Sequence, residues 1–160
     1  MAQLKKQSWT SYFLDMAQMA ATRTTCLSPA KGAVIVKNKS IVSTGYNGAP
    51  RGVPDCKYQR GECIKRRKGY EHGTGHHVCL AAHAEANAIA QAARTGVAIE
   101  GSTMYCTHKP CRECAKLIIN SGIIEVVYIE DYPNDSEELF HDAGVRIRRS
   151  SDGTFRSGNF

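Results

Sequence analysis

The second half of the chain alternates helix-like and strand-like segments, and this alternation constrains the fold more than any other feature of the sequence. Amphipathic periodicity with capping residues predicts helices, and short β-rich apolar runs predict strands. We expect helices at residues 82–95, 111–122 and 134–144, and strands at residues 102–108, 123–130 and 145–149. Strands separated by helices favour parallel pairing with helices on both faces of the sheet, so the sequence predicts an α/β fold.

The first half of the chain adds a helix and a hairpin. Apolar residues recur at helical spacing between about Ser8 and Thr24, which predicts a helix with one packed face. Two β-rich runs, GAVIVKN and SIVSTGYN, flank a polar turn at Lys37–Ser40 and predict a β-hairpin. We therefore expect a mixed sheet of about five strands.

A long irregular segment separates the two halves. Residues 48–79 contain glycines, prolines, a KRRK run and several Cys and His residues, without sustained periodicity. A loop of this length in a compact domain needs a functional or stabilising role. We expect residues 1–160 to form a single domain that carries this Cys/His-bearing insertion, and the last ten residues to be a frayed tail.

Composition narrows the partners and the compartment. The formal net charge of +6 suits an anionic partner such as a nucleotide or a nucleic acid. The N-terminus lacks the apolar run of a signal peptide, and no stretch has the length and apolarity of a membrane span, so we expect a soluble cytoplasmic protein. The number of cysteines, seven, is odd and does not suit a closed disulfide framework. Some of these cysteines are therefore better explained as thiolate ligands of a metal.

Two short motifs at expected helix starts carry residues that bind metals. HAE places His83 two residues before Glu85, and PCREC places Cys111 and Cys114 where both thiols can reach one point. A single Cys-x-x-Cys could be redox-active or structural, and a single His-x-Glu is weak evidence. Together, His-x-Glu and Pro-Cys-x-x-Cys form the pattern of zinc-dependent nucleobase deaminases.

These residues suit a catalytic zinc site. His83, Cys111 and Cys114 supply three ligands, which leaves the fourth tetrahedral position for a water. Glu85 lies too close to His83 in sequence for easy co-ligation, so we expect it to shuttle protons between that water and the substrate. In the competing interpretation, His83 caps a helix, Glu85 is a solvated acid and the two cysteines are core residues. Three independent features would then have to coincide by chance to resemble a catalytic zinc site.

The chain resembles the deoxycytidylate deaminases of the zinc-dependent cytidine and deoxycytidylate deaminase superfamily. The resemblance covers about residues 9–149 and is carried by TRTTC, GAVIVKNKSIVSTGYNGAP, HAEANAI and GSTMYCTHKPCRECAKLIINSGIIEVVYIEDYP. It implies a three-layer α/β/α fold of the cytidine-deaminase type. It also implies hydrolytic deamination of dCMP to dUMP and ammonia by a zinc-activated water, which would supply dUMP for thymidylate synthesis.

The resemblance further implies which residues surround the substrate. Asn47 matches an asparagine that contacts the sugar, and Arg23 matches a basic position near the 5′-phosphate. Tyr132 is expected to stack on or close over the base, and Ala84 to be a further substrate contact. Each residue also has a purely structural alternative: Asn47 could form a turn, Arg23 could be a surface residue and Tyr132 could pack against a turn.

Regulation and assembly are also implied by the resemblance. In many relatives dCTP with magnesium activates and dTTP inhibits, through a site that includes the GYNG tetrad. The tetrad consists here of Gly45, Tyr46, Asn47 and Gly48. A turn built from Gly and Asn would look the same without regulation. The resemblance favours a homo-oligomer, commonly a hexamer.

A second, structural zinc occurs in the insertion of some relatives. The segment has too few apolar residues to fold by burial, and a metal commonly stabilises such segments. The ligands that we expect are Cys26, Cys56, His76 and Cys79, with Cys63 or His77 as substitutes and His72 as a further histidine of the segment. Scattered reduced thiols are the alternative. Cys106 lies in an apolar strand and is expected to be a core residue.

Two other functions compete with nucleotide deamination. A nucleic-acid cytosine or adenosine deaminase would use basic runs such as KRRK and RIRR, although short runs of this kind are usually solvated. A non-enzymatic zinc scaffold would not need Glu85, because zinc binding does not require that carboxylate. Ammonia release from nucleotides, nucleosides and a cytosine-containing oligonucleotide separates these functions.

Overall fold

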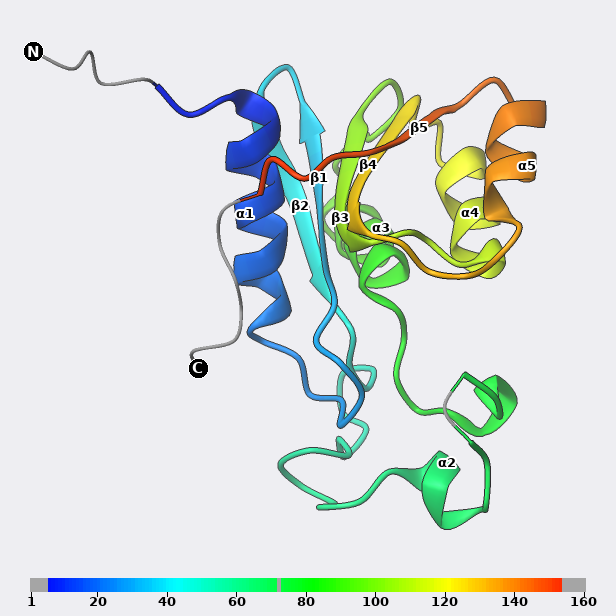
Figure 1. Cartoon of the computed structure of the whole chain (residues 1–160). Helices are drawn as coiled ribbons and strands as arrows, with labels where there is room; N and C mark the ends of the chain where they lie inside the picture. Colours follow the sequence, from blue (N-terminus) through cyan, green and yellow to red (C-terminus); the bar gives the residue numbers. More distant parts are fainter. Residues whose placement is uncertain (1–5, 72, 154–160) are drawn as a thin grey trace, which may run out of the picture.

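A single mixed sheet organises the chain, as the computed structural model shows for residues 6–71 and 73–153 (Figure 1). Its five strands lie in the order β2-β1-β3-β4-β5. Their bounds are β1 Gly32–Lys37, β2 Ser40–Tyr46, β3 Thr103–His108, β4 Glu125–Glu130 and β5 Arg146–Arg149. The β1–β2 and β1–β3 pairs are antiparallel, whereas β3, β4 and β5 run parallel. The expected hairpin and mixed sheet are confirmed.

Helices cover both faces of this sheet. Helix α1 (Trp9–Ala21) packs on one face, and α3 (Ala84–Thr95), α4 (Arg112–Asn120) and α5 (Ser136–Asp142) pack on the other. Each of these helices begins and ends within three residues of the expected bounds. The three-layer α/β/α fold is therefore confirmed. None of the described helices combines the length and apolarity needed to cross a membrane.

The two faces of the sheet are built from alternate residues of the same strands. In β1, Val34 faces α1 and Ile35 faces the opposite helices, and both side chains are fully buried. In β3, Tyr105 belongs to the core under α1, while Cys106 belongs to the other core and is 1% exposed. This period of two explains the near-continuous apolar sequence of these strands. It also confirms Cys106 as a core residue.

Glycine allows α3 to lie directly against the hairpin. A Cβ atom on Gly45 of β2 would collide with the backbone of Ala84 and Ala88 in α3. The Ser43 hydroxyl donates a hydrogen bond to the Ala88 carbonyl at 2.6 Å. Because β2 fixes α3 in this way, it also fixes the helix N-terminus, where the HAE motif lies.

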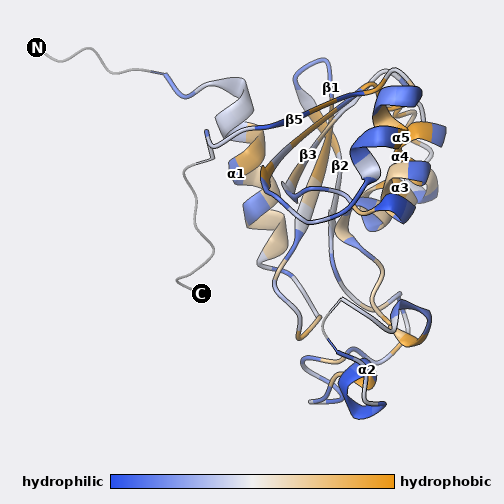
Figure 2. Cartoon of the chain, turned by 45° about the vertical axis from the view of Figure 1, so that its right-hand side comes forward, coloured by the Kyte–Doolittle hydropathy of each residue, from blue (hydrophilic) through white to orange (hydrophobic). Residues whose placement is uncertain are grey.

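The insertion projects from one end of the sheet (Figure 1). Apolar residues are concentrated in the central strands in Figure 2, whereas polar residues are frequent in the insertion. It contains two short pieces that the sequence did not predict, α2 (Ile64–Arg67) and a 3-10 turn at His76–Val78. Its base is closed where the Gly48 and Ala82 N–H groups donate to each other's carbonyl at 3.1 and 2.9 Å.

The expected frayed tail lies mostly outside the described residues. Residues 151–153 have no regular secondary structure, and residues 154–160 are not described. His72 of the insertion also lies outside the described residues.

Candidate metal centre

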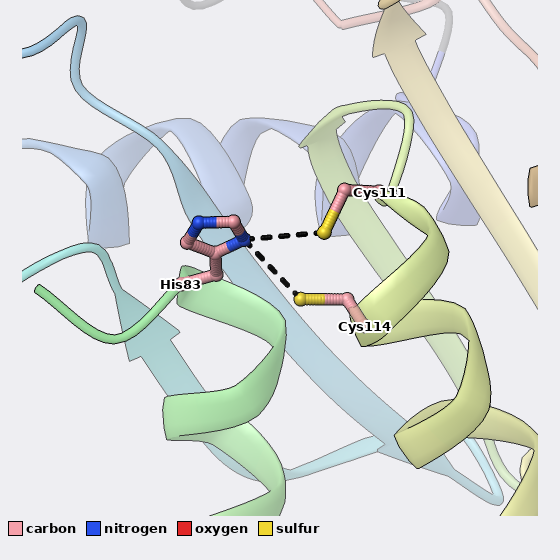
Figure 3. Close-up of side chains that lie close together, drawn as sticks. All are labelled: His83, Cys111 and Cys114. Carbon is pink, nitrogen blue, oxygen red and sulfur yellow. Dashed lines mark hydrogen bonds between the residues drawn. The ribbon is translucent and has the colours of Figure 1, made fainter. Parts of the chain in front are cut away.

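Three side chains that can bind a metal meet at the N-termini of α3 and α4 (Figure 3). His83 is the N-cap residue of α3, Cys111 is the N-cap residue of α4, and Cys114 lies in the first turn of α4. The Nδ1 atom of His83 lies 3.3 Å from Cys111 Sγ and 3.5 Å from Cys114 Sγ. Across the described part of the chain, this is the one group of three or more such residues with ligand atoms within 4.8 Å.

The donor set and spacing of this cluster fit zinc. One imidazole nitrogen and two thiol sulfurs are ligands that zinc prefers. With metal–ligand bonds of about 2.0–2.3 Å in a tetrahedron, the ligand atoms lie roughly 3.5 Å apart. The observed separations of 3.3 and 3.5 Å agree with this geometry. Three protein ligands also leave one tetrahedral position open for a reactant.

The cluster already favours a thiolate. Hydrogen bonds from Cys114 and from His83 lower the pKa of the Cys111 thiol to about 3. The same interaction with Cys111 raises the pKa of Cys114, which keeps its proton. The hydrogen bond to Cys111 also raises the pKa of His83. These interactions favour the thiolate form, which is the form of cysteine that binds metals.

Glu85 points into the same site. The side chain is buried, and the Cys114 thiol donates to its Oε2 atom at 3.7 Å. Burial raises the pKa of Glu85, because the charged carboxylate is poorly solvated there. A carboxyl group with a raised pKa is suited to take up and release protons near neutral pH. Ala84, a predicted substrate contact, is the buried first residue of α3.

Asn47, the predicted sugar-binding residue, is buried and bonded to the segment before β1. Its Oδ1 atom accepts the Lys31 N–H at 2.9 Å, and its Nδ2 atom donates to the Pro29 carbonyl at 3.2 Å. Its backbone carbonyl accepts the Thr24 hydroxyl at 2.9 Å. Arg23, the predicted phosphate ligand, is exposed just after the end of α1.

The structure reveals a cation that the sequence reasoning missed. Lys31 Nζ lies 4.5 Å from the ring centroid of Tyr132, the residue predicted to cover the base. Burial, followed by the charge of Lys31, lowers the pKa of His108 to about 4, so this imidazole is neutral at pH 7. The sequence signal for Lys31 is its position directly before β1, because strand ends on one sheet edge gather side chains.

The first half of the GYNG tetrad lines a separate cavity of about 390 Å³ beside α3. Gly45 and Tyr46 belong to its wall, together with Arg51 and Arg94. Asn47 and Gly48 do not belong to that wall. Asn47 holds the segment before β1, and Gly48 closes the base of the insertion.

Four cysteines gather in and around the insertion. Cys26, Cys56 and Cys63 are buried, Cys79 is half-buried, and all are free thiols. Burial raises the pKa of Cys56, an N–H from Ile64 acts in the opposite sense, and the nearby Cys63, Cys26 and Cys79 thiols raise it further. No three of these four sulfurs lie within 4.8 Å of one another, in contrast to the ligand atoms of His83, Cys111 and Cys114, the His83 cluster.

The histidines expected beside these cysteines have other neighbours. His76 Nε2 lies 2.8 Å from the Gly73 carbonyl oxygen, and the His76 ring stands edge-on to the His83 ring at 6.1 Å. His77 Nε2 lies 3.1 Å from the Tyr70 hydroxyl. The thiols whose charge interactions raise the pKa of Cys56 are those of Cys63, Cys26 and Cys79, so Cys63, the predicted substitute ligand, lies near Cys56.

The sequence has clear relatives among known proteins. Residues 7–130 match the family described as "Cytidine and deoxycytidylate deaminase zinc-binding region". The chain is 39% identical over 153 residues to a deoxycytidylate deaminase of Saccharomyces cerevisiae, covering 94% of this chain and 47% of that protein. It is 39% identical over 130 residues to a deoxycytidylate deaminase of Mycobacterium phage D29, covering 78% of this chain and 97% of that protein. The chain thus spans about half the length of the yeast relative.

Solved structures show the same architecture. A dCMP deaminase from the cyanophage S-TIM5, in complex with dCMP and dUMP, superposes with a TM-score of 0.74 at 28% sequence identity. The match covers 92% of this chain and 100% of the cyanophage chain.

Proposed function

Because this chain belongs to the cytidine and deoxycytidylate deaminase family, we propose that it hydrolyses dCMP to dUMP and ammonia. The observation that carries this proposal is Glu85, a buried acid placed beside a set of three zinc-type ligands. The deoxycytidylate deaminases among its relatives and its similarity to a structure that holds dCMP and dUMP support this substrate.

The proposed chemistry depends on proton transfers by Glu85. A zinc ion held by His83, Cys111 and Cys114 would supply a Lewis acid that makes a water more acidic. Glu85 accepts a proton from the attacking water and delivers it to N3, the ring nitrogen beside the amino-bearing carbon. After the hydroxyl oxygen has bonded to that carbon, Glu85 takes the remaining hydroxyl proton and transfers it to the amino group. The carbon–nitrogen bond breaks, ammonia leaves and the keto base remains.

The fold supplies electrostatic support for this reaction. The N-termini of α3 and α4 both point at the site, and each carries partial positive charge. This potential favours anionic ligands and the negative charge that develops on the attacking oxygen. It also offsets the two thiolates, which would otherwise reduce the acidity of the water.

Ammonia release from a panel of substrates tests the proposed activity. The zinc-loaded protein should be assayed with dCMP, CMP, deoxycytidine, dCTP and a cytosine-containing oligonucleotide. We expect kcat/KM for dCMP to exceed that for deoxycytidine by at least about a hundredfold, because charge-assisted hydrogen bonds to a phosphate are strong. Release from the oligonucleotide alone would support nucleic-acid deamination, and release from none of these substrates would support a zinc scaffold.

A second zinc in the insertion is part of the proposal. We assign it to Cys26, Cys56, Cys63 and Cys79, with Cys63 in place of His76. The interactions of the other three thiols with Cys56 support this set. Because they are more widely spaced than the His83 cluster, metal binding must draw the loops together, which couples the metal to local folding.

Nucleotide regulation would use the cavity lined by Gly45, Tyr46, Arg51 and Arg94. Two guanidinium groups suit a triphosphate such as dCTP, with magnesium, or dTTP. Activity measured with each effector, in the wild type and in Arg94→Met, tests this assignment. A homo-oligomer, with a hexamer favoured by family resemblance, is tested by light scattering.

The proposal also includes a single domain and a cytoplasmic location. The described residues form one sheet with a core on each face, which supports the single domain. The seven free cysteines suit a reducing compartment.

A further inference from the structure

Lys31 places a positive charge beside the candidate metal centre. The next residue, Gly32, donates its N–H to the Thr107 hydroxyl at 3.1 Å, and Thr107 precedes the candidate ligand Cys111 by four residues at the end of β3. The charge of Lys31 is also the second cause, after burial, of the lowered pKa of His108. Lys31 is half-buried, and among residues 6–71 and 73–153 no carboxylate forms an ion pair with it. This cation is therefore free to pair with an anion that enters the site.

The backbone of Lys31 is held on both sides. Its N–H donates to Asn47 Oδ1 at 2.9 Å, and its carbonyl accepts the Asn47 N–H at 3.2 Å. The next N–H, from Gly32, donates to the Thr107 hydroxyl at 3.1 Å. Because Asn47 and Thr107 are both buried, the segment before β1 has little freedom to move. Lys31 therefore extends from a fixed point at the edge of the sheet.

The aromatic neighbour of Lys31 is fixed from another part of the chain. The Tyr132 N–H donates to Asp131 Oδ1 at 2.8 Å, and Lys109 Nζ lies 2.9 Å from the same oxygen. The side chain of Lys109 is only 7% exposed, so this ion pair joins the 131–132 loop to the end of β3. Tyr132 is thereby held over the Lys31 ammonium, which a cation–π contact stabilises.

We propose that Lys31 binds the 5′-phosphate of the nucleotide substrate, with Tyr132 and Asn47 as the residues that position it. The inference rests on the proposed function and names a determinant of its specificity. A phosphate monoester carries up to two negative charges and offers several acceptor oxygens to an ammonium group. Arg23 is exposed, and within residues 6–71 and 73–153 its side chain makes no ion pair or cation–π contact. Lys31 should therefore distinguish nucleoside monophosphates from nucleosides.

A competing role is electrostatic tuning of the reaction centre. If Lys31 acted only through the protonation of His83 and Glu85, its removal would change the rate with every cytosine substrate by the same factor. A phosphate contact changes the rate only for substrates that carry the phosphate. Comparison of dCMP with deoxycytidine thus separates the two roles.

Three variants make this comparison. Lys31→Met removes the charge and keeps the length of the stem, and Lys31→Arg restores the charge. Lys39→Met is the matched control, because Lys39 also lies over an aromatic ring, 5.7 Å from the Trp9 centroid. Lys39 follows the opposite end of β1, roughly 20 Å from Lys31 at about 3.3 Å per residue.

Two readouts are needed for each zinc-loaded variant. The first is kcat/KM for dCMP, deoxycytidine and a cytosine-containing oligonucleotide, which separates a phosphomonoester from a phosphodiester. The second is the calorimetric affinity for dUMP and deoxyuridine, which does not depend on turnover. We expect Lys31→Met to reduce kcat/KM for dCMP and affinity for dUMP by about 10- to 100-fold. Values for deoxycytidine and deoxyuridine should change less than about twofold, and Lys31→Arg should recover most of the loss.

Equal losses with dCMP and deoxycytidine, or an unchanged ratio between them, would overturn the phosphate contact while leaving the deaminase activity in place. A larger loss with the oligonucleotide than with dCMP would also overturn it, in favour of a phosphodiester. Lys31-dependent dUMP binding in a wild-type protein that releases no ammonia would instead overturn the proposed activity and retain the contact. No preference of the wild type for dUMP over deoxyuridine would overturn the contact directly.

Discussion

The His83 cluster and the insertion cysteines gather metal-binding side chains in two different ways. His83, Cys111 and Cys114 sit at helix starts that pack against a buried sheet, and their ligand atoms lie within 4.8 Å. The insertion cysteines, Cys26, Cys56, Cys63 and Cys79, lie in or near loops with little regular secondary structure. Their sulfur atoms are more widely spaced than the ligand atoms of the His83 cluster. Regular structure therefore preorganises the His83 cluster, whereas the proposed second site would complete its geometry only on metal binding.

This difference separates two uses of a metal. A reaction requires ligands and a proton shuttle at fixed positions, and rigid elements provide them before any ligand arrives. A structural metal can instead supply the energy that orders its own loops. Loss of one ligand should thus affect chemistry in the first region and mainly local order in the second.

The largest effect is expected from Cys114→Ala. Removal of one of three ligands should release zinc from the His83 cluster and reduce dCMP turnover to background. Metal analysis and ammonia release measure the two losses. Cys106→Ala is the matched control, because Cys106 is a buried thiol of the same core that takes no part in the cluster. A Cys114→Ala protein with zinc in this site would contradict the assignment.

Glu85→Gln should uncouple zinc binding from catalysis. We expect turnover to fall by roughly a thousandfold, because the amide cannot transfer protons, while zinc content stays unchanged. Glu113→Gln should have little effect, since Glu113 is an exposed acid that pairs with Lys116. Metal content and steady-state kinetics are measured together. Near-normal turnover in Glu85→Gln would remove Glu85 from the mechanism.

Cys56→Ser should distinguish the insertion from the catalytic region. We expect the zinc content to fall from about two ions per chain toward one, and the melting temperature to fall by roughly 5 °C or more. Turnover of dCMP should change far less than in Glu85→Gln. One zinc per fully loaded wild-type chain would refute the second site.

Comparison of Cys63→Ser with His76→Ala tests the ligand set of that second site. Cys63→Ser should lose zinc as Cys56→Ser does, whereas His76→Ala should keep it, because His76 contacts Gly73 and His83 instead. The opposite result would restore His76 as the fourth ligand. Metal analysis of the purified variants gives the answer.

The smallest effect is expected from Asp131→Asn. The Lys109 ammonium lowers the pKa of Asp131, so their pairing stabilises the fold fully above the ordinary carboxyl pKa and is lost as the pH falls through the lower folded value. Asp131 is exposed, so the melting temperature at pH 6 should fall by no more than a few degrees. That difference from the wild type should shrink as the pH is lowered from 5 to 3. A difference that is constant across this range would exclude the ion pair as its cause.

The fold and the His83 cluster could be predicted because their signals are local in sequence. Burial on both faces of β1 and β3 appears as continuous β-rich runs, and the three-residue spacing of Cys111 and Cys114 matches one helical turn. Sequence-based expectations for these elements depend only on the periods of strands and helices. The parallel and antiparallel pairings then bring the two motifs together.

Other features depend on contacts between distant segments. Lys31 becomes notable because the 131–132 loop places an aromatic ring over it, and nothing in the neighbouring sequence specifies that contact. Cys63 lies near Cys56 because the irregular chain of the insertion folds back there. Cys63 is the N-cap residue of α2, a helix of only four residues. Such short helices lie below the length at which periodicity can be recognised.

The paired hydrogen bonds between Gly48 and Ala82 have a consequence for how the chain tolerates change in length. They join the two ends of the insertion immediately before His83, so residues 49–81 form a closed loop. Each doubling of a flexible loop costs only about 0.6 kcal/mol of closure entropy. Segments can therefore be added, removed or exchanged within this loop while α3 keeps its register against β2. The half of the molecule that carries the His83 cluster is thus insulated from variation in the loop that precedes it.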